Sequence, residues 1–163
     1  MPLASEFADL ELLCFDVLFK TDKVRFFNIY RPPCTDPTSI NYIDILIKCL
    51  TFHFAKRHSN VFVGDFNCPQ INWNYPSCIV NDYVCKGVVN WIATSGLTQF
   101  VKFPTRQTNI LDLVLCDNDQ LICDVTSSPP IGHSDHNVVD FMLLVCDGKM
   151  TLMKILILLN MLV

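Results

Sequence analysis

The sequence predicts a mixed α/β (α+β) fold, because short apolar strands and amphipathic helices follow one another without a strict strand–helix–strand repeat. Leu10–Val17 and Val24–Tyr30 are rich in β-branched and aromatic residues and are separated by a polar turn, which is typical of a hairpin. Pro37–Arg57 carries apolar residues at helical spacing and predicts a helix. The chain has 163 residues and no internal repeat, which favours one domain.

A second helix is expected at Asn81–Ser95, with Asn81 or Asp82 as its N-cap and Gly96 as its end. Further strands are expected at Val61–Phe66, Leu111–Cys116 and Val138–Val145. Most of these strands are short and apolar, which indicates a sheet buried on both faces or packed against a second sheet.

Composition limits the classes of function. Hydrophobic residues make up 51% of the chain and charged residues 17%, with a formal net charge of -4. Such a chain can bury a core. The negative net charge argues against a surface that binds nucleic acid by charge alone, because nucleic-acid-binding domains of that kind are usually basic. A nuclease remains compatible, because a few placed cations and a metal can supply the affinity.

The nine cysteines are odd in number and include no C-x-x-C pair, which argues against a disulfide scaffold or a zinc site. They are interpreted as small apolar fillers in a reducing compartment. The N-terminus lacks the basic and apolar segments of a signal peptide. We therefore expect an intracellular protein, in the cytoplasm or nucleus, that is not secreted.

The segment from Thr151 to Val163 is strongly apolar, but it is shorter than the roughly 20 residues that a membrane helix needs. Lys154 and Asn160 interrupt it further. No membrane partner is expected.

The sharpest motif is the buried strand that runs directly into Gly64-Asp65-Phe66-Asn67. Asp65 and Asn67 point to the same side of an extended segment, which places a carboxylate and an amide together at the end of a strand. Gly64 allows close backbone approach. The alternative is a structural turn in which Asp and Asn bond their own backbone, and spacing alone would favour that turn.

Three further motifs carry polar groups that suit phosphate chemistry. Asp112 lies inside an apolar strand and, if buried, needs a partner such as a histidine; otherwise it faces solvent on an edge strand. Asp135-His136 can hold a metal or orient a phosphate, or it can form a simple turn. Tyr30, before Arg31-Pro32-Pro33, can donate to a phosphate oxygen or pack as an ordinary aromatic residue.

Taken in order, the four motifs resemble the downstream motifs of the endonuclease/exonuclease/phosphatase superfamily. Phe103-Pro104-Thr105 and the Asn-Cys-Pro-Gln-Ile-Asn-Trp segment that starts at Asn67 are similar to the endonucleases of non-LTR retrotransposons. The resemblance covers roughly Leu10 to Val145. It implies a four-layer, two-sheet sandwich and a metal-dependent phosphodiester hydrolase that acts on DNA with Mg²⁺, or with Mn²⁺ in its place.

The resemblance also implies a role for each matching residue. Asp65 would orient or deprotonate the attacking water and help to hold the metal, and Asp135 would lie close to the metal. Asn67 and Tyr30 would contact the scissile phosphate. His136 would stabilise the charge on that phosphate, with Asp112 hydrogen-bonded to its ring. Thr105 would contact the nucleic-acid backbone.

The chain departs from the family pattern at its start, because only nine residues precede the first expected strand and the family's Asn and Glu motifs have no counterpart. We therefore expect residues 1–147 to form an N-terminally incomplete domain, with 148–163 as an apolar tail outside it. Weak Mg²⁺ binding, impaired catalysis and self-association through an uncovered apolar surface would follow. The alternatives are a non-catalytic retrotransposon-derived fragment or interaction module, and a lipid-phosphate hydrolase of the same superfamily.

Overall fold

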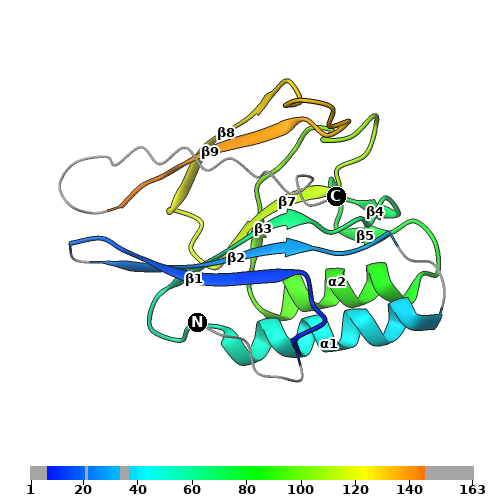
Figure 1. Cartoon of the computed structure of the whole chain (residues 1–163), viewed down its shortest axis with the longest axis horizontal. Coiled ribbons are helices and arrows are strands. Elements are labelled where there is room, and N and C mark those ends of the chain that lie inside the picture. Colours follow the sequence, from blue (N-terminus) through cyan, green and yellow to red (C-terminus); the bar gives the residue numbers. More distant parts are fainter. Residues whose placement is uncertain (1–6, 21, 34–36, 146–163) are drawn as a thin grey trace.

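The computed structural model describes residues 7–20, 22–33 and 37–145, with the side chains of residues 37–39 outside the description. A central sheet lies between a pair of helices and a two-stranded hairpin (Figure 1). The longer elements are β1 (Leu12–Leu18), β2 (Lys23–Tyr30), α1 (Pro37–His53), β3 (Ser59–Asp65), α2 (Tyr83–Thr94), β7 (Asp112–Cys116), β8 (Ile122–Ser128) and β9 (Val138–Leu143). Three two-residue strands complete the set: β4 (Ile71–Asn72), β5 (Ser77–Cys78) and β6 (Thr98–Gln99).

The central sheet has five strands in the order β1-β2-β3-β7-β6. β1 and β2 form the expected antiparallel hairpin, whereas β2 and β3 are parallel and are joined through α1. β3 pairs with β7 in antiparallel register. The carboxyl ends of β2 and β3 therefore meet the start of β7 at one edge of the molecule, and this edge carries three of the four motifs.

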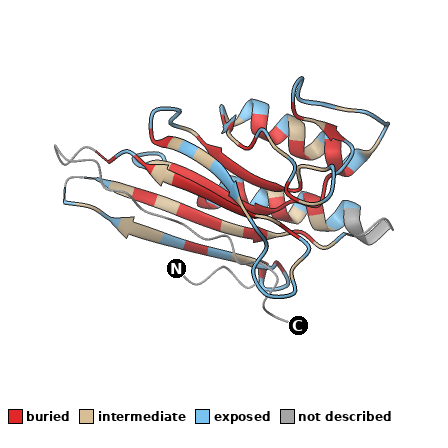
Figure 2. Cartoon of the chain, turned by 90° about the horizontal axis from the view of Figure 1, so that it is seen from above, coloured by how far each residue is buried: buried red, intermediate tan, exposed pale blue. Residues whose placement is uncertain are grey.

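Two hydrophobic clusters hold the layers together. Helices α1 and α2 cover one face of the sheet, where the rings of Phe27 and Phe62 stack with centroids 4.4 Å apart. The β8–β9 hairpin packs over part of the other face, where Phe26, Val61 and Phe141 are buried. Buried residues concentrate in the inner strands of the central sheet, while the hairpin turns are exposed (Figure 2).

The helices agree with expectation except at their ends. Asp82 is the N-cap of α2 and accepts a hydrogen bond from the Cys85 amide at 2.7 Å, and Gly96 follows the helix with φ +66°. Helix α1 ends at His53, four residues before the predicted end at Arg57. The side chain of Asn60 bonds both backbone groups of Ala55, which turns the chain away from the helix.

Strand β8 was not predicted, because most of its side chains are polar or exposed and its register with β9 shifts between Cys123 and Thr126. Asp124 takes φ +49° at this irregularity. Seven of the cysteines interpreted as core fillers are described: Cys78 and Cys123 are half-buried, and five are buried, namely Cys14, Cys49, Cys68, Cys85 and Cys116. Cys34, Cys146 and the predicted domain boundary after residue 147 lie outside the described residues.

Strand β1 forms one edge of the central sheet within the described part of the chain. Leu13 and Leu18 are 58% and 75% exposed on it. An apolar edge strand is a template for association, so the expected self-association has a candidate surface here. None of the helices in the described residues is both long and apolar enough to span a membrane.

Candidate active site

Strand register brings Tyr30, Asp65 and Asp112 together. Tyr30 and Asp65 are partners at the carboxyl ends of the parallel strands β2 and β3, and Asp65 is also the partner of Asp112 at the start of β7. Both aspartates are buried, with 3% and 5% of their surface exposed. The alternative of a solvent-facing Asp112 is therefore wrong, and the two carboxylates share one end of the sheet.

Gly64 makes this register possible. Its φ is +137°, and a Cβ built on it would lie 1.9 Å from the backbone oxygen of Ile29 on β2. No side chain fits at that distance, so only glycine lets the two parallel strands approach here. The close backbone approach predicted from the sequence is confirmed. It sets the position of Asp65, the next residue, relative to the end of β2.

Asn67 and Arg31 fix the Asp65 carboxylate. The Asn67 backbone amide donates to Asp65 Oδ1 and its side-chain amide donates to Asp65 Oδ2, both at 2.9 Å. The Arg31 guanidinium, 5% exposed, donates to the backbone oxygens of Phe66 (2.6 Å) and Asn67. Asn67 adopts φ +48°, which asparagine tolerates better than most residues. The turn that follows β3 therefore holds the Asp65 carboxylate in one orientation.

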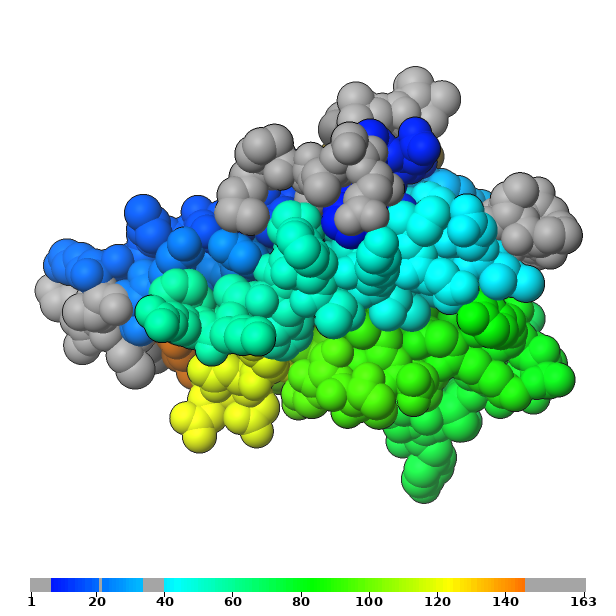
Figure 3. Space-filling model, turned by 90° about the horizontal axis from the view of Figure 1, so that it is seen from below, coloured from blue at the N-terminus to red at the C-terminus, as the bar shows by residue number. Residues whose placement is uncertain are grey.

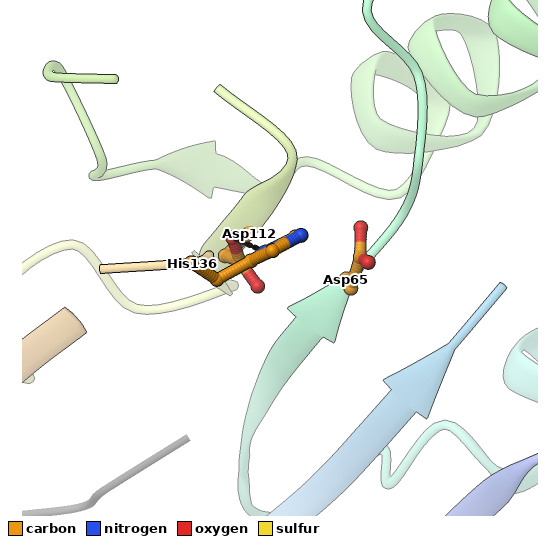
Figure 4. Close-up of side chains that lie close together, drawn as sticks. All are labelled: Asp65, Asp112 and His136. Atoms are coloured by element: carbon orange, nitrogen blue, oxygen red, sulfur yellow. Dashed lines mark hydrogen bonds and ion pairs between the residues drawn. The ribbon is translucent and has the colours of Figure 1, made fainter. Parts of the chain in front are cut away.

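The Asp112–His136 pair is present as expected. His136 Nδ1 lies 2.8 Å from Asp112 Oδ2, and the two side chains are 9% and 8% exposed. The hydrogen bond to Asp112 raises the pKa of His136 above its usual value, although burial opposes the shift. The other ring nitrogen points towards Asp65 (Figure 4). A carboxylate held on Nδ1 fixes the ring and its tautomer, as in catalytic triads.

Thr105 supports Asp112 from behind. The side chain is fully buried, and its hydroxyl oxygen accepts hydrogen bonds from the backbone amides of Leu111 (3.0 Å) and Asp112 (3.1 Å). Both bonds anchor the start of β7. The predicted contact of Thr105 with nucleic acid stays a prediction.

The ionised form of Asp65 is disfavoured in the folded protein. Burial, and then the nearby Asp112 carboxylate, raises the pKa of Asp65 to about 6. One ligand atom from each of Asp65, Asp112 and His136 can be chosen so that all three lie within 4.8 Å of one another. Two buried carboxylates facing each other are stabilised by a cation, and hard oxygen donors are what Mg²⁺ prefers. The donor chemistry of this group therefore fits a divalent metal, with the two aspartates as its oxygen ligands.

Asp135 lies at the rim, outside this group. Its carboxylate is paired with Arg106, with Oδ2 2.8 Å from Nε and 2.7 Å from Nη2, and its side chain is 57% exposed. Its Oδ1 is 3.9 Å from His136 Nε2. The predicted metal role of Asp135 stays a prediction, and in this conformation the carboxylate is neutralised by Arg106.

Sequence reasoning did not identify Arg31 or Arg106 as site residues. Arg31 follows Tyr30 directly at a strand end, so its position was a usable signal. Arg106 follows Thr105, but its partner is 29 residues away in the sequence. That contact depends on a turn in which Arg106 and Asn109 form an isolated bridge.

Comparisons with known proteins bear on the family and the fold of the chain. A sequence profile described as endonuclease-reverse transcriptase matches residues 24–140. Among curated proteins nothing matches the chain. The similar solved structures include the endonuclease domain of TRAS1, a telomere-specific non-LTR retrotransposon, with TM-score 0.60 and 16% identity over 85% of this chain and 71% of that one.

Two further structures share the fold at lower identity. An AP endonuclease from Archaeoglobus fulgidus has TM-score 0.57 and 13% identity over 75% of this chain and 62% of that one. An endonuclease/exonuclease/phosphatase family protein from Leptotrichia buccalis C-1013-b has TM-score 0.51 and 11% identity over 81% and 53%. The chain therefore spans 53–71% of the length of these three structures, and at these identities the likeness shows the fold alone.

Proposed function

Because the chain belongs to the endonuclease-reverse transcriptase family, we propose that it is a metal-dependent phosphodiester hydrolase that acts on DNA. The buried group of Asp65, Asp112 and His136 is the observation that carries the proposal. Two buried carboxylates close to each other destabilise the folded protein, and packing does not require them. Such an arrangement is therefore typical of a functional site. Family membership also supports the proposal of a four-layer, two-sheet sandwich, with the α1–α2 pair as one outer layer.

Asp65 is the general base in this proposal. Its carboxylate accepts a proton from water as the water oxygen bonds to phosphorus. The bond from phosphorus to the leaving sugar oxygen breaks, and that oxygen takes up a proton from solvent. In the metal-free protein the pKa of Asp65 is raised to about 6, so the carboxylate is still ionised at neutral pH and can accept a proton. Asn67 donates to both carboxylate oxygens and to the Arg31 backbone oxygen, so it orients the base, while its contact with the phosphate stays a prediction.

His136 and Tyr30 stabilise the phosphate charge. With Nδ1 bonded to Asp112, His136 directs its other nitrogen into the site, and its raised pKa favours the cation. Burial, and then the Asp65 carboxylate, raises the pKa of Tyr30, so its hydroxyl stays protonated and can donate to a phosphate oxygen. Fixed donors aimed at developing charge are a large part of phosphoryl-transfer catalysis.

Asp65 and Asp112 are the residues that would hold Mg²⁺ or Mn²⁺. A bound divalent ion polarises the phosphoryl oxygen and lowers the barrier by several kcal/mol. Mg²⁺ needs near-octahedral oxygen coordination, and only two carboxylates converge here among the described residues. Asp135 would have to leave Arg106 to join them. We therefore expect weak metal binding and slow turnover.

A non-catalytic role is the second candidate, and the same Asp135–Arg106 pair favours it. A carboxylate neutralised by arginine contributes little to a metal site, so the domain could bind DNA without cleaving it.

Nicking of supercoiled plasmid with Mg²⁺ or Mn²⁺ tests the proposal. We expect slow nicking that Asp65→Asn and His136→Ala abolish, while Asp44→Asn on the exposed face of α1 leaves it unchanged. Nicking that survives both site substitutions would show that the assigned residues do not act. No nicking at any metal concentration would refute the hydrolase and leave the non-catalytic candidate.

A further inference from the structure

An open hollow of about 830 Å³ lies at the end of the molecule opposite the candidate active site. β3 runs between the two, since Ser59 at its start lines the hollow and Asp65 at its end lies in the site. A strand rises about 3.3 Å per residue, so six steps separate the two by about 20 Å. In Figure 3 the β1–β2 turn, the α1–β3 loop, the segment after β7 and the end of β9 meet at the left of the view.

Cations are concentrated around this hollow. The chain has 12 Lys and Arg residues, and four of them line it: Lys20, Lys23, Lys56 and Arg57. Lys23 is paired with Asp16 at 2.7 Å. Lys20, Lys56 and Arg57 are exposed, and none takes part in the ion pairs found among the described residues. A third of the Lys and Arg residues of an acidic chain thus faces one concave surface.

The loop that carries Lys56 and Arg57 is fixed in place. Asn60, fully buried at the start of β3, donates from its side chain to the backbone oxygens of Ala55 (2.9 Å) and His58 (3.1 Å) and accepts from the Ala55 amide (2.8 Å). These bonds clamp the loop on both sides of its two cations. A pre-ordered loop loses less entropy when it binds an anion.

Two acidic residues, Asp22 and Asp117, also line the hollow, and the four cations outnumber them. Both oxygens of the Asp117 carboxylate accept hydrogen bonds from Asn60, one from its backbone amide at 2.8 Å and one from its side chain at 2.7 Å. These two hydrogen bonds hold the Asp117 carboxylate against Asn60 at the start of β3. Phe19 and Leu144 add apolar surface to the same lining.

We propose that this hollow binds a single-stranded segment of nucleic acid, with Lys56, Arg57 and Lys20 on its phosphates. Cations from two separate segments suit a run of phosphates better than one anion, and an apolar wall suits unpaired bases. The choice of nucleic acid over another polyanion rests on the proposed function. Such a site would also reconcile the -4 net charge with a DNA substrate, because a local cluster of cations attracts phosphates even on an acidic protein.

The test is the anisotropy of a short fluorescent oligothymidylate in EDTA, measured over a range of NaCl concentrations. The variant Lys56→Gln/Arg57→Gln is compared with Lys48→Gln/Lys86→Gln, which removes the same charge from the helices. Each phosphate contact on a single strand contributes about 0.7 to the slope of log K against log salt. The first variant is therefore expected to lower the slope by about 1.4 and to weaken binding about tenfold near 0.15 M salt. The control should keep the wild-type slope.

Three outcomes overturn the proposal: equal losses in the two variants, no loss in either, or equally tight binding of a polyglutamate peptide that depends on the same residues. Lys20→Gln provides an independent variant on the other wall, with an expected slope loss of about 0.7. Because the measurement excludes metal, it is separate from cleavage. Plasmid nicking without oligothymidylate binding would refute only the proposal that the hollow binds nucleic acid. Binding without nicking would refute only the proposal that the protein is a hydrolase.

Discussion

Replacing Asp65 with asparagine is expected to stabilise the metal-free protein at pH 8. The folded state raises the pKa of this carboxyl from 3.8 to about 6, which means that folding disfavours the ionised form. A gap of about two pKa units corresponds to roughly 3 kcal/mol. Asparagine removes this penalty but can accept only one of the two hydrogen bonds from Asn67, which costs about 1 kcal/mol. The expected net gain is about 2 kcal/mol.

The gain depends on pH in a defined direction. Above about pH 6 Asp65 is ionised in both states, and the wild-type protein bears the full penalty. As the pH falls from 6 towards 3.8, the folded state takes up the proton first, so wild-type stability rises and the advantage of Asp65→Asn disappears. Near pH 4 the variant should be no more stable than the wild type.

Urea unfolding in EDTA, followed by the fluorescence of buried Trp73 and Trp91, measures both effects. Asp16→Asn is the matched control, because hydrogen bonding to Arg25 lowers the pKa of Asp16 and the same substitution should destabilise the protein at pH 8. A loss of stability in Asp65→Asn at pH 8, or a gain that persists unchanged at pH 4, would refute the electrostatic account of the site.

Three further predictions concern metal binding at Asp65, the backbone contact at Gly64 and the exposed edge strand β1. In thermal unfolding at pH 8, Mg²⁺ at about ten times its dissociation constant should stabilise the wild type by about 1.4 kcal/mol but should not stabilise Asp65→Asn. Equal shifts of the unfolding midpoint in the two proteins would place the metal elsewhere. Gly64→Ala should cost more than about 3 kcal/mol in urea unfolding, because its Cβ would meet backbone at 1.9 Å. Gly132→Ala, with nothing within 4 Å, should cost only about 1 kcal/mol for its positive φ, and similar costs would contradict the contact. Leu13→Lys on the β1 edge should reduce self-association in sedimentation velocity, while Ile40→Lys on α1 should not; equal effects would exclude the edge as the interface.

The parts of the fold that the sequence predicted correctly are those whose causes are local. The apolar run before Gly64 marks β3, and the Asp82 cap and Gly96 bracket α2, since each depends on neighbouring residues. The contact between Asp112 and His136 is not local, and it was predicted from the order of the motifs and the need of a buried carboxylate for a partner.

What escaped prediction depends on contacts between distant segments. The guanidinium of Arg31 reaches two backbone oxygens that only the β2–β3 register brings near it. Asp135 meets Arg106 through a tight turn in which Gln107 has φ +52°, an unusual conformation for glutamine. The early end of α1 follows from Asn60, whose side chain competes with the helix for the backbone of Ala55.

The parallel pairing of β2 with β3 also has a kinetic consequence. Parallel strands cannot close through a tight turn, so β3 joins the sheet only after the chain has passed through α1. β7 must then find β3 across α2, and His136 arrives from 24 residues beyond Asp112. Contacts so distant in sequence form slowly. The three side chains should therefore come together late in refolding, so the NMR signals of the His136 ring would report completion of the native state.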